Sequence, residues 1–135
     1  MSFLNSILKA FVGDKSKQDV KAIMPIVEQV KTYESTLEKL SHDELREKTA
    51  SFKEKIAEAR KELLDKKEQL LKDAEATEDI DQREDIYQEA DKLDDDIYEV
   101  TEKVLDEILP EAFAVVKETA KRFVNNTTIE VTASV

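Results

Sequence analysis

The chain has 135 residues, a length typical of one domain, with one Gly, two Pro and 39% charged residues. So few turn residues exclude a β-sandwich or a Rossmann domain and favour long helices joined by few turns. Cysteine is absent, which excludes a disulfide framework and a thiolate zinc site and fits a cytosolic protein.

The net charge of −11 is unevenly distributed along the chain. Residues 41–109 hold twelve Lys or Arg against 24 acidic residues, whereas residues 1–40 are close to neutral and residues 110–135 are balanced. An acidic surface repels a phosphate backbone, so no nucleic acid is expected as a partner. No apolar run approaches the roughly 20 residues that span a bilayer.

Residues 1–12 are predicted to form a short amphipathic helix, because apolar residues recur there at intervals of three and four. The apolar stripe consists of Phe3, Leu4, Ile7, Leu8 and Phe11, with Lys9 outside it. No basic cluster precedes the stripe and no small-residue cleavage site follows, which argues against a signal peptide. Two interpretations stay open: the stripe packs on its own protein, or it inserts reversibly at a membrane surface.

Residues 13–40 are predicted to contain a second helix, which follows a break at Gly13. Its apolar side is formed by Val20, Ile23, Met24, Val27, Val30 and Leu37. Pro25 lies inside this pattern and removes one backbone hydrogen bond, so a kink or a fresh start is expected near Met24.

Residues 41–109 are predicted to form a long antiparallel hairpin of two helices with its tip near 76–81. Ser41 and Glu44 have the spacing of a capping box at the start of the first arm, which leaves His42 exposed in the first turn. The apolar seam, coiled-coil-like in the second arm, consists of Leu45, Phe52, Ile56, Leu63, Leu70, Ile86, Leu93, Ile97, Val100 and Val104. Lys66 and Asp73 interrupt this register, so looser packing is expected toward the tip.

Residues 110–126 are predicted to form a separate helix, because Pro110 suits a first helical turn better than a helix interior. Residues 127–135 are rich in β-branched residues and alternate like a strand, yet the chain offers no second strand. The expected fold class is therefore all-α, a long helical hairpin with shorter flanking helices and a β-prone C-terminal tail. The unpaired strand suggests that the rest of its sheet lies outside this chain.

No constellation of residues in the chain supports catalysis or cofactor binding. Residues 91–96 (DKLDDD) lack the central glycine of a calcium loop, and one glycine is too few for a phosphate loop. The lone histidine lies in a capping turn, so no nucleophilic triad is proposed. Asn125 and Asn126 begin glycosylation sequons that should stay unmodified without secretion. No catalytic residue, cofactor or metal ligand is expected.

Two stretches resemble the N-terminal region of SecA, the ATP-driven motor of bacterial preprotein translocation. They are residues 40–52 (LSHDELREKTASF) and 108–122 (ILPEAFAVVKETAKR), and residues 11–15 (FVGDK) are similar to a turn of the same family. The resemblance covers residues 1 to about 126. It differs in one respect, since about 45 residues between Ala59 and Lys103 lengthen both arms, as in Bacteroidetes-like members.

The resemblance implies that this chain is one segment of a larger motor whose ATP and magnesium sites lie further along the sequence. It also implies that the N-terminal stripe, with Lys9, contacts acidic phospholipid and the SecYEG channel, with preproteins as the motor's substrates. Such a protein would be cytoplasmic and peripherally associated with the inner membrane. This segment alone should have no ATPase activity.

A second hypothesis comes from another class of protein. The chain could be a stand-alone coiled-coil adaptor or oligomerisation module that forms a homodimer through Ile86, Leu93 and Val100. Its prediction is an oligomer that depends on concentration and is abolished by Leu93→Asp.

Overall fold

The structure is a computed structural model that describes residues 15–126 and residue 128. These residues form three helices, α2 (Lys15–Leu37), α3 (His42–Ala76) and α4 (Ile80–Asn125), and no strand. The all-α class is therefore confirmed for the described part of the chain. The amphipathic segment 1–12 and most of the β-prone tail lie outside the described residues.

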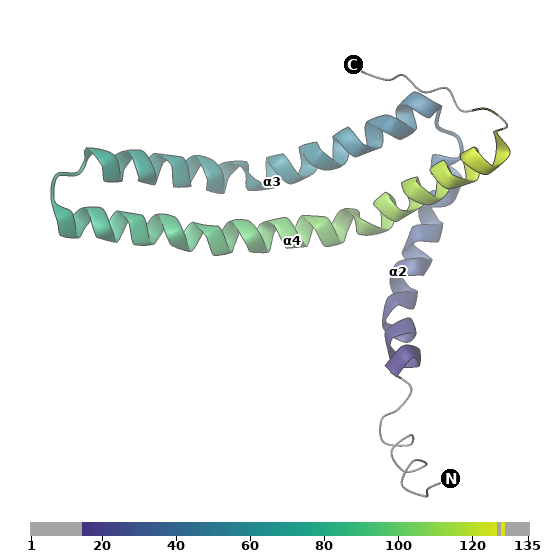
Figure 1. Cartoon of the computed structure of the whole chain (residues 1–135), viewed down its shortest axis with the longest axis horizontal. Helices are drawn as coiled ribbons and strands as arrows, with labels where there is room; N and C mark the ends of the chain where they lie inside the picture. The colour runs from purple at the N-terminus through teal and green to yellow at the C-terminus, as the bar shows by residue number, and fades with distance from the viewer. Residues whose placement is uncertain (1–14, 127, 129–135) are drawn as a thin grey trace, which may run out of the picture.

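Helices α3 and α4 run antiparallel, side by side, as a long hairpin, and α2 crosses α4 near the open end of that hairpin (Figure 1). The arms are joined at 77–79, between the end of α3 and the start of α4. With 46 residues, α4 is about 69 Å long at 1.5 Å per residue and extends past the start of α3. Its last third therefore remains available to pack against α2.

The starts of both arms are fixed by side-chain caps. The Ser41 hydroxyl accepts from the Glu44 N–H at 3.2 Å, and the Glu44 carboxylate accepts from the Ser41 N–H at 2.7 Å. The hydrogen bond from the Ser41 N–H is the main cause that lowers the pKa of the Glu44 carboxyl below its usual value, and a hydrogen bond with the Ser41 side chain is the second cause. At the other end of the hairpin, Asp79 accepts from the Gln82 N–H at 2.9 Å. The predicted capping box is thus present.

Neither proline ends a helix. The expectation of a separate helix after Pro110 is wrong, because α4 continues from Ile80 through Pro110 to Asn125. Pro110 is buried beside Ile108 and near Ala114 and Val115, and this packing on both sides compensates for the lost backbone bond. Pro25 likewise lies inside α2, which runs unbroken from Lys15 to Leu37.

The hydrophobic core lies at the open end of the hairpin, where all three helices meet. Its largest fully buried side chain is Leu37, with 1% of its surface exposed. The other buried members come from both arms and are Leu45, Phe52, Ile108, Ala114 and Val115. The core therefore joins the end of α2, the start of α3 and the last third of α4.

Beyond this core the two arms pack on each other through a single seam. The ten predicted seam residues are all buried or half-buried. Ala74 and Ala90 are fully buried, but Leu63, Leu70 and Ile86 are only half-buried, and Ile80 at the tip is 70% exposed. Most of the seam is therefore less buried toward the tip than near the core, as expected. Lys66 remains exposed and pairs with Glu89 across the arms at 3.2 Å, so it is accommodated at the edge of the seam.

Candidate functional site

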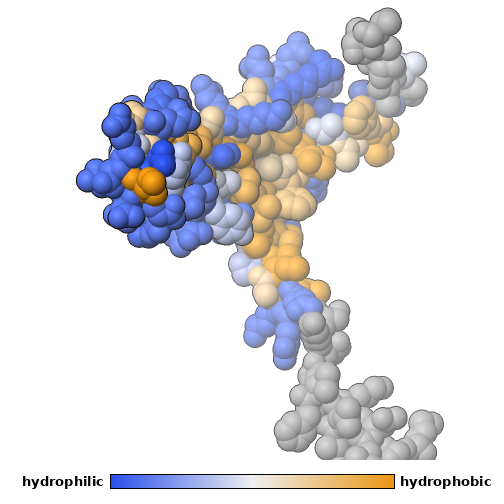
Figure 2. Space-filling view, turned by 60° about the vertical axis from the view of Figure 1, so that its left-hand side comes forward, coloured by the Kyte–Doolittle hydropathy of each residue, from blue (hydrophilic) through white to orange (hydrophobic). Residues whose placement is uncertain are grey.

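An apolar surface is left uncovered on the side of the molecule where α2 meets α4, and we call it the α2–α4 apolar face. It is formed by residues whose side chains are largely exposed, namely Val20, Ile23, Met24 and Val27 of α2 and Phe113, Val116 and Val124 of α4. Figure 2 shows apolar residues gathered along α2 and the adjoining end of the hairpin, whereas the arms are mainly hydrophilic. Exposed patches of this kind mark interaction surfaces.

A groove of about 280 Å³ runs between the two helices within this face. Ile23, Ile26, Val27 and Val30 line it from α2, and Phe113 lines it from α4 together with the stem of Lys117. Phe113 and Ile23 are each more than half exposed, at 58% and 54%. The groove thus offers apolar contact area with few groups for polar recognition, as expected of a surface that receives another apolar element.

The junction behind this face is organised by Arg122. Its Nη2 donates to the carbonyls of Leu37 and Leu40 at 3.1 and 2.8 Å, and its Nε donates to the Glu118 carboxylate at 2.8 Å. Glu118 is buried, and this bond compensates for the desolvation of its charge. One guanidinium therefore closes the C-terminus of α2, whose last carbonyls have no partner within the helix.

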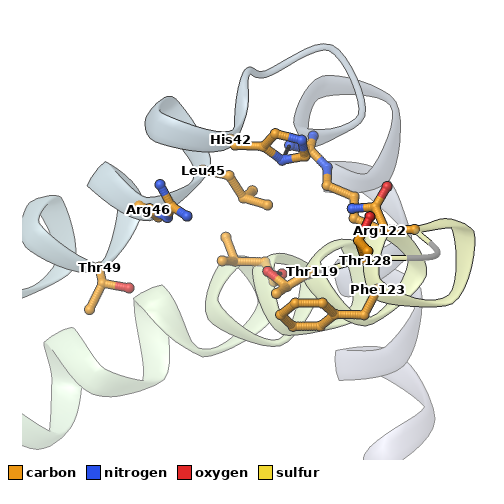
Figure 3. Close-up of a pocket in the computed structure, with 10 residues that line it drawn as sticks. His42, Leu45, Arg46, Thr49, Thr119, Arg122, Phe123 and Thr128 are labelled. Atoms are coloured by element: carbon orange, nitrogen blue, oxygen red, sulfur yellow. Dashed lines mark hydrogen bonds between the residues drawn. The ribbon is translucent and has the colours of Figure 1, made fainter. Parts of the chain in front are cut away.

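A second cavity, of about 490 Å³, lies between the start of α3 and the end of α4 (Figure 3). His42 and Leu45 enter it from α3, and Arg122 and Phe123 enter it from α4. The Arg122 Nη1 lies 3.3 Å from His42 Nδ1. His42 is exposed, as expected for the first turn. The cavity is lined by basic side chains, by the hydroxyls of Thr49, Thr119 and Thr128, and by apolar residues, and no carboxylate is among its lining residues.

Two ion pairs link α2 to α4 along the edge of the junction. Glu34 accepts from Lys117, and Glu38 accepts from Lys121 at 2.8 Å. The hydrogen bond from Lys121 is the main cause that lowers the pKa of the Glu38 carboxyl, and the same bond raises the pKa of Lys121. All four side chains are at least 44% exposed, so these pairs fix the orientation of α2 more than they stabilise the fold.

The acidic charge of the hairpin belongs mainly to its second arm. Residues 42–76 hold nine basic and ten acidic residues, whereas residues 80–107 hold three basic and twelve acidic ones. Few basic residues of α3 form ion pairs with the excess carboxylates of α4. Lys66 pairs with Glu89, and Lys67 pairs with Asp94. Most carboxylates of α4 therefore face solvent.

Among the described residues, no group of three or more His, Cys, Asp or Glu side chains is placed to hold a metal ion. In the same part of the chain, no helix is long and apolar enough to cross a bilayer. The N-terminal stripe that sequence reasoning selected for membrane or channel contact, Phe3, Leu4, Ile7, Leu8, Lys9 and Phe11, lies outside the described residues. The described residues thus present one extended apolar face and no cluster of side chains placed to hold a metal ion.

Sequence reasoning did not find the Arg122 junction. The two carbonyls that Arg122 binds are 82 and 85 positions away in the sequence, and backbone carbonyls carry no residue signature. The only available signal was the position of Arg122 at the end of the stretch 108–122. The exposed half of α2 was identified as apolar, but only the structure shows that none of the residues it describes covers that half.

The family model described as "SecA DEAD-like domain" matches residues 8–133. This chain belongs to the SecA family. Among curated relatives, the SecA translocase subunit of Christiangramia forsetii is 63% identical over 134 residues, which cover 99% of this chain and 12% of that protein. The subunits of Flavobacterium psychrophilum and Porphyromonas gingivalis are 58% and 41% identical over similar spans. No solved structure matches.

These alignments have two consequences for a SecA chain of this kind. The chain spans about 12% of the length of the curated relatives that it matches. The alignments run almost from end to end of this chain, so they include the long acidic hairpin. The hairpin is therefore a feature that this chain shares with SecA subunits of Bacteroidetes.

Proposed function

We propose that the chain is the N-terminal segment of a SecA-type motor, which couples ATP hydrolysis to the movement of preproteins through the SecYEG channel. The observation that carries this proposal is the family match over residues 8–133, together with end-to-end alignment to translocase subunits. Within the motor, the three helices supply a scaffold and docking surfaces. The ATP and magnesium sites belong to parts of the parent protein outside this chain.

The second part of the proposal concerns the N-terminal stripe of residues 3–11. With Lys9 nearby, an apolar helix face of this size suits shallow insertion among acidic phospholipids and contact with the channel. The parent protein would then act on the cytoplasmic side of the inner membrane, bound to its surface.

Two assays test these roles in the 135-residue chain. The chain should hydrolyse no ATP, and it should sediment with anionic vesicles in a manner that Ile7→Asp abolishes. Asn5→Asp is the matched control, because it adds the same charge on the polar side of the predicted helix. ATP hydrolysis by this chain, or equal vesicle binding by both variants, would contradict the proposal.

The adaptor hypothesis makes a different prediction for the seam. In the structure Leu93 is only 5% exposed and lies between the two arms of one chain, so it is not available to a second copy while the hairpin is closed. We therefore expect a monomer in sedimentation equilibrium at micromolar concentration. An oligomer that Leu93→Asp abolishes, and that the exposed-site control Tyr98→Asp preserves, would favour the adaptor.

A further inference from the structure

The first half of α2 carries an apolar stripe that nothing in the described residues covers. Val20, Ile23 and Met24 are 55%, 54% and 42% exposed. Further along the same side of α2, Val30 and Leu37 pack on the core, because Ile23, Val30 and Leu37 follow one another at intervals of seven residues. The stripe is thus unpartnered, and water contact with so much apolar surface is unfavourable by about 25 cal/mol per Å².

We propose that the N-terminal segment, residues 1–12, folds back as a helix onto this stripe and covers it. The connection is short, because only Gly13 and Asp14 separate the segment from the start of α2 at Lys15. Two helices joined by so few residues form an antiparallel pair. Gly13 supplies the freedom that such a tight reversal requires.

The lengths of the two apolar stripes agree. A helix of twelve residues is about 18 Å long, and that distance along α2 runs from Lys15 to about Val27. The exposed stripe of α2 ends at the same residue, Val27, where α2 already lines the groove that it shares with Phe113 of α4. The N-terminal segment therefore covers the exposed half of α2 without reaching the part that is already packed.

The spacing of the apolar residues agrees as well. Leu4, Leu8 and Phe11 follow one another at intervals of four and three, as do Val20, Met24 and Val27. In an antiparallel pair that reverses at Gly13 and Asp14, Leu8 lies opposite Val20 and Leu4 lies opposite Met24. Apolar residues then meet apolar residues along the contact, and Ser6 and Lys9 remain in water.

The segment's tether favours it over other occupants of the stripe. A short linker gives it an effective concentration on the order of millimolar, which a second copy at micromolar concentration does not match. The segment is also the nearest apolar element along the chain. For the 135-residue chain on its own, lipid is the remaining competitor, since one stripe cannot contact α2 and a membrane at the same time. Docking on α2 thus keeps the N-terminal stripe from contacting a membrane until it is released. This consequence rests on the proposed function, whereas the docking itself does not.

The absence of native cysteine makes a crosslinking test direct. Leu8→Cys with Val20→Cys should form an intrachain disulfide about tenfold faster than Ser6→Cys with Val20→Cys, under mild oxidation of the dilute 135-residue chain. The two loops are nearly equal in length, so loop closure alone gives nearly equal rates. Equal rates would overturn the proposal. Disulfide-linked dimers in place of the intrachain product would assign the stripe to a second copy and overturn it too.

A second set of variants separates docking from the proposed function. Met24→Glu should slow the Leu8–Val20 crosslink several-fold and increase sedimentation with anionic vesicles. Val116→Glu, on the part of the α2–α4 apolar face that lies on α4, is the matched control and should change neither. A crosslink rate that is indifferent to Met24→Glu would overturn the docking, whether or not the vesicles bind. Vesicle binding that is absent in every variant would count against the membrane role alone.

Discussion

At Arg122, one side chain satisfies backbone groups at the end of α2 and a buried carboxylate on α4. Hydrogen bonds to carbonyls at a helix end replace partners that the helix cannot supply. Glu118 is 9% exposed at its side chain, and its charge is tolerable in that position because Arg122 is beside it. The junction therefore depends on a single guanidinium far more than on the exposed ion pairs around it.

Arg122→Met should lower the free energy of unfolding by about 2–4 kcal/mol, since it removes three hydrogen bonds and leaves the buried Glu118 with only the distant Lys121, at 4.0 Å, as a partner. Lys121→Met is the matched control, because Lys121 is 53% exposed and its loss should lower the free energy of unfolding far less. Urea denaturation followed by circular dichroism measures both. Similar losses in the two variants would show that the junction does not depend on Arg122.

The Glu38–Lys121 pair should make the docking of α2 sensitive to acid. The pKa of Glu38 is lower in the folded chain than its ordinary value, so the pair stabilises the fold above the unfolded pKa, and this contribution is lost as the pH falls through the folded pKa. Glu38→Gln should therefore reduce the urea midpoint at pH 7 and have no effect at pH 2.5. If the urea midpoints of the original chain and of Glu38→Gln differ as much at pH 2.5 as at pH 7, the ion pair is not the source of the difference.

At the scale of the elements, the two prolines lie inside helices that tolerate them at a cost. Pro25 is exposed within α2, so it contributes little packing and still removes one backbone hydrogen bond. Pro110 differs, because it is buried and its neighbours fix α4 on both sides. The two sites should respond differently to alanine.

Pro25→Ala should stabilise α2 by about 1–3 kcal/mol, because alanine restores the hydrogen bond and has the highest helix propensity. The midpoint of thermal unfolding and the helical signal at 222 nm measure the effect. Lys21→Ala, also exposed in α2, should change stability by less than about 0.5 kcal/mol. A loss of stability in Pro25→Ala would mean that the proline has a packing partner in α2.

The elements also show what the sequence could and could not predict. The spacing of apolar residues and the helix caps involve only residues close in sequence. The seam of α4 and the start of α3 at Ser41 could therefore be predicted. The effect of Pro110 depends on packing between distant segments, and local rules therefore placed a helix end where none exists. The full burial of Ala74 could not be predicted from the register of the first arm alone, because it depends on the packing of both arms.

At the scale of the whole molecule, the fold is extended, and its core is confined to one end. The arms beyond the core are held by one seam, so a substitution there should affect the hairpin strongly. Leu93→Ala should cost about 2–4 kcal/mol through the cavity that it leaves. Tyr98→Ala, at a side chain 65% exposed, should cost less than about 1 kcal/mol, and hydrogen exchange in the two arms would measure both. Equal protection in the two variants would contradict a hairpin held by this seam.

The continuity of α4 through Pro110 has a mechanical consequence. From Ile108, near the core, the helix extends about 42 Å to Ile80 at the tip and about 26 Å to Asn125 in the other direction. A rod of this kind, pivoting near the core, converts a 3 Å swing of the tip into a displacement of about 2 Å at Asn125. A force on the tip of the acidic arm therefore reaches the segment that follows Asn125 with a smaller displacement and a modest mechanical advantage.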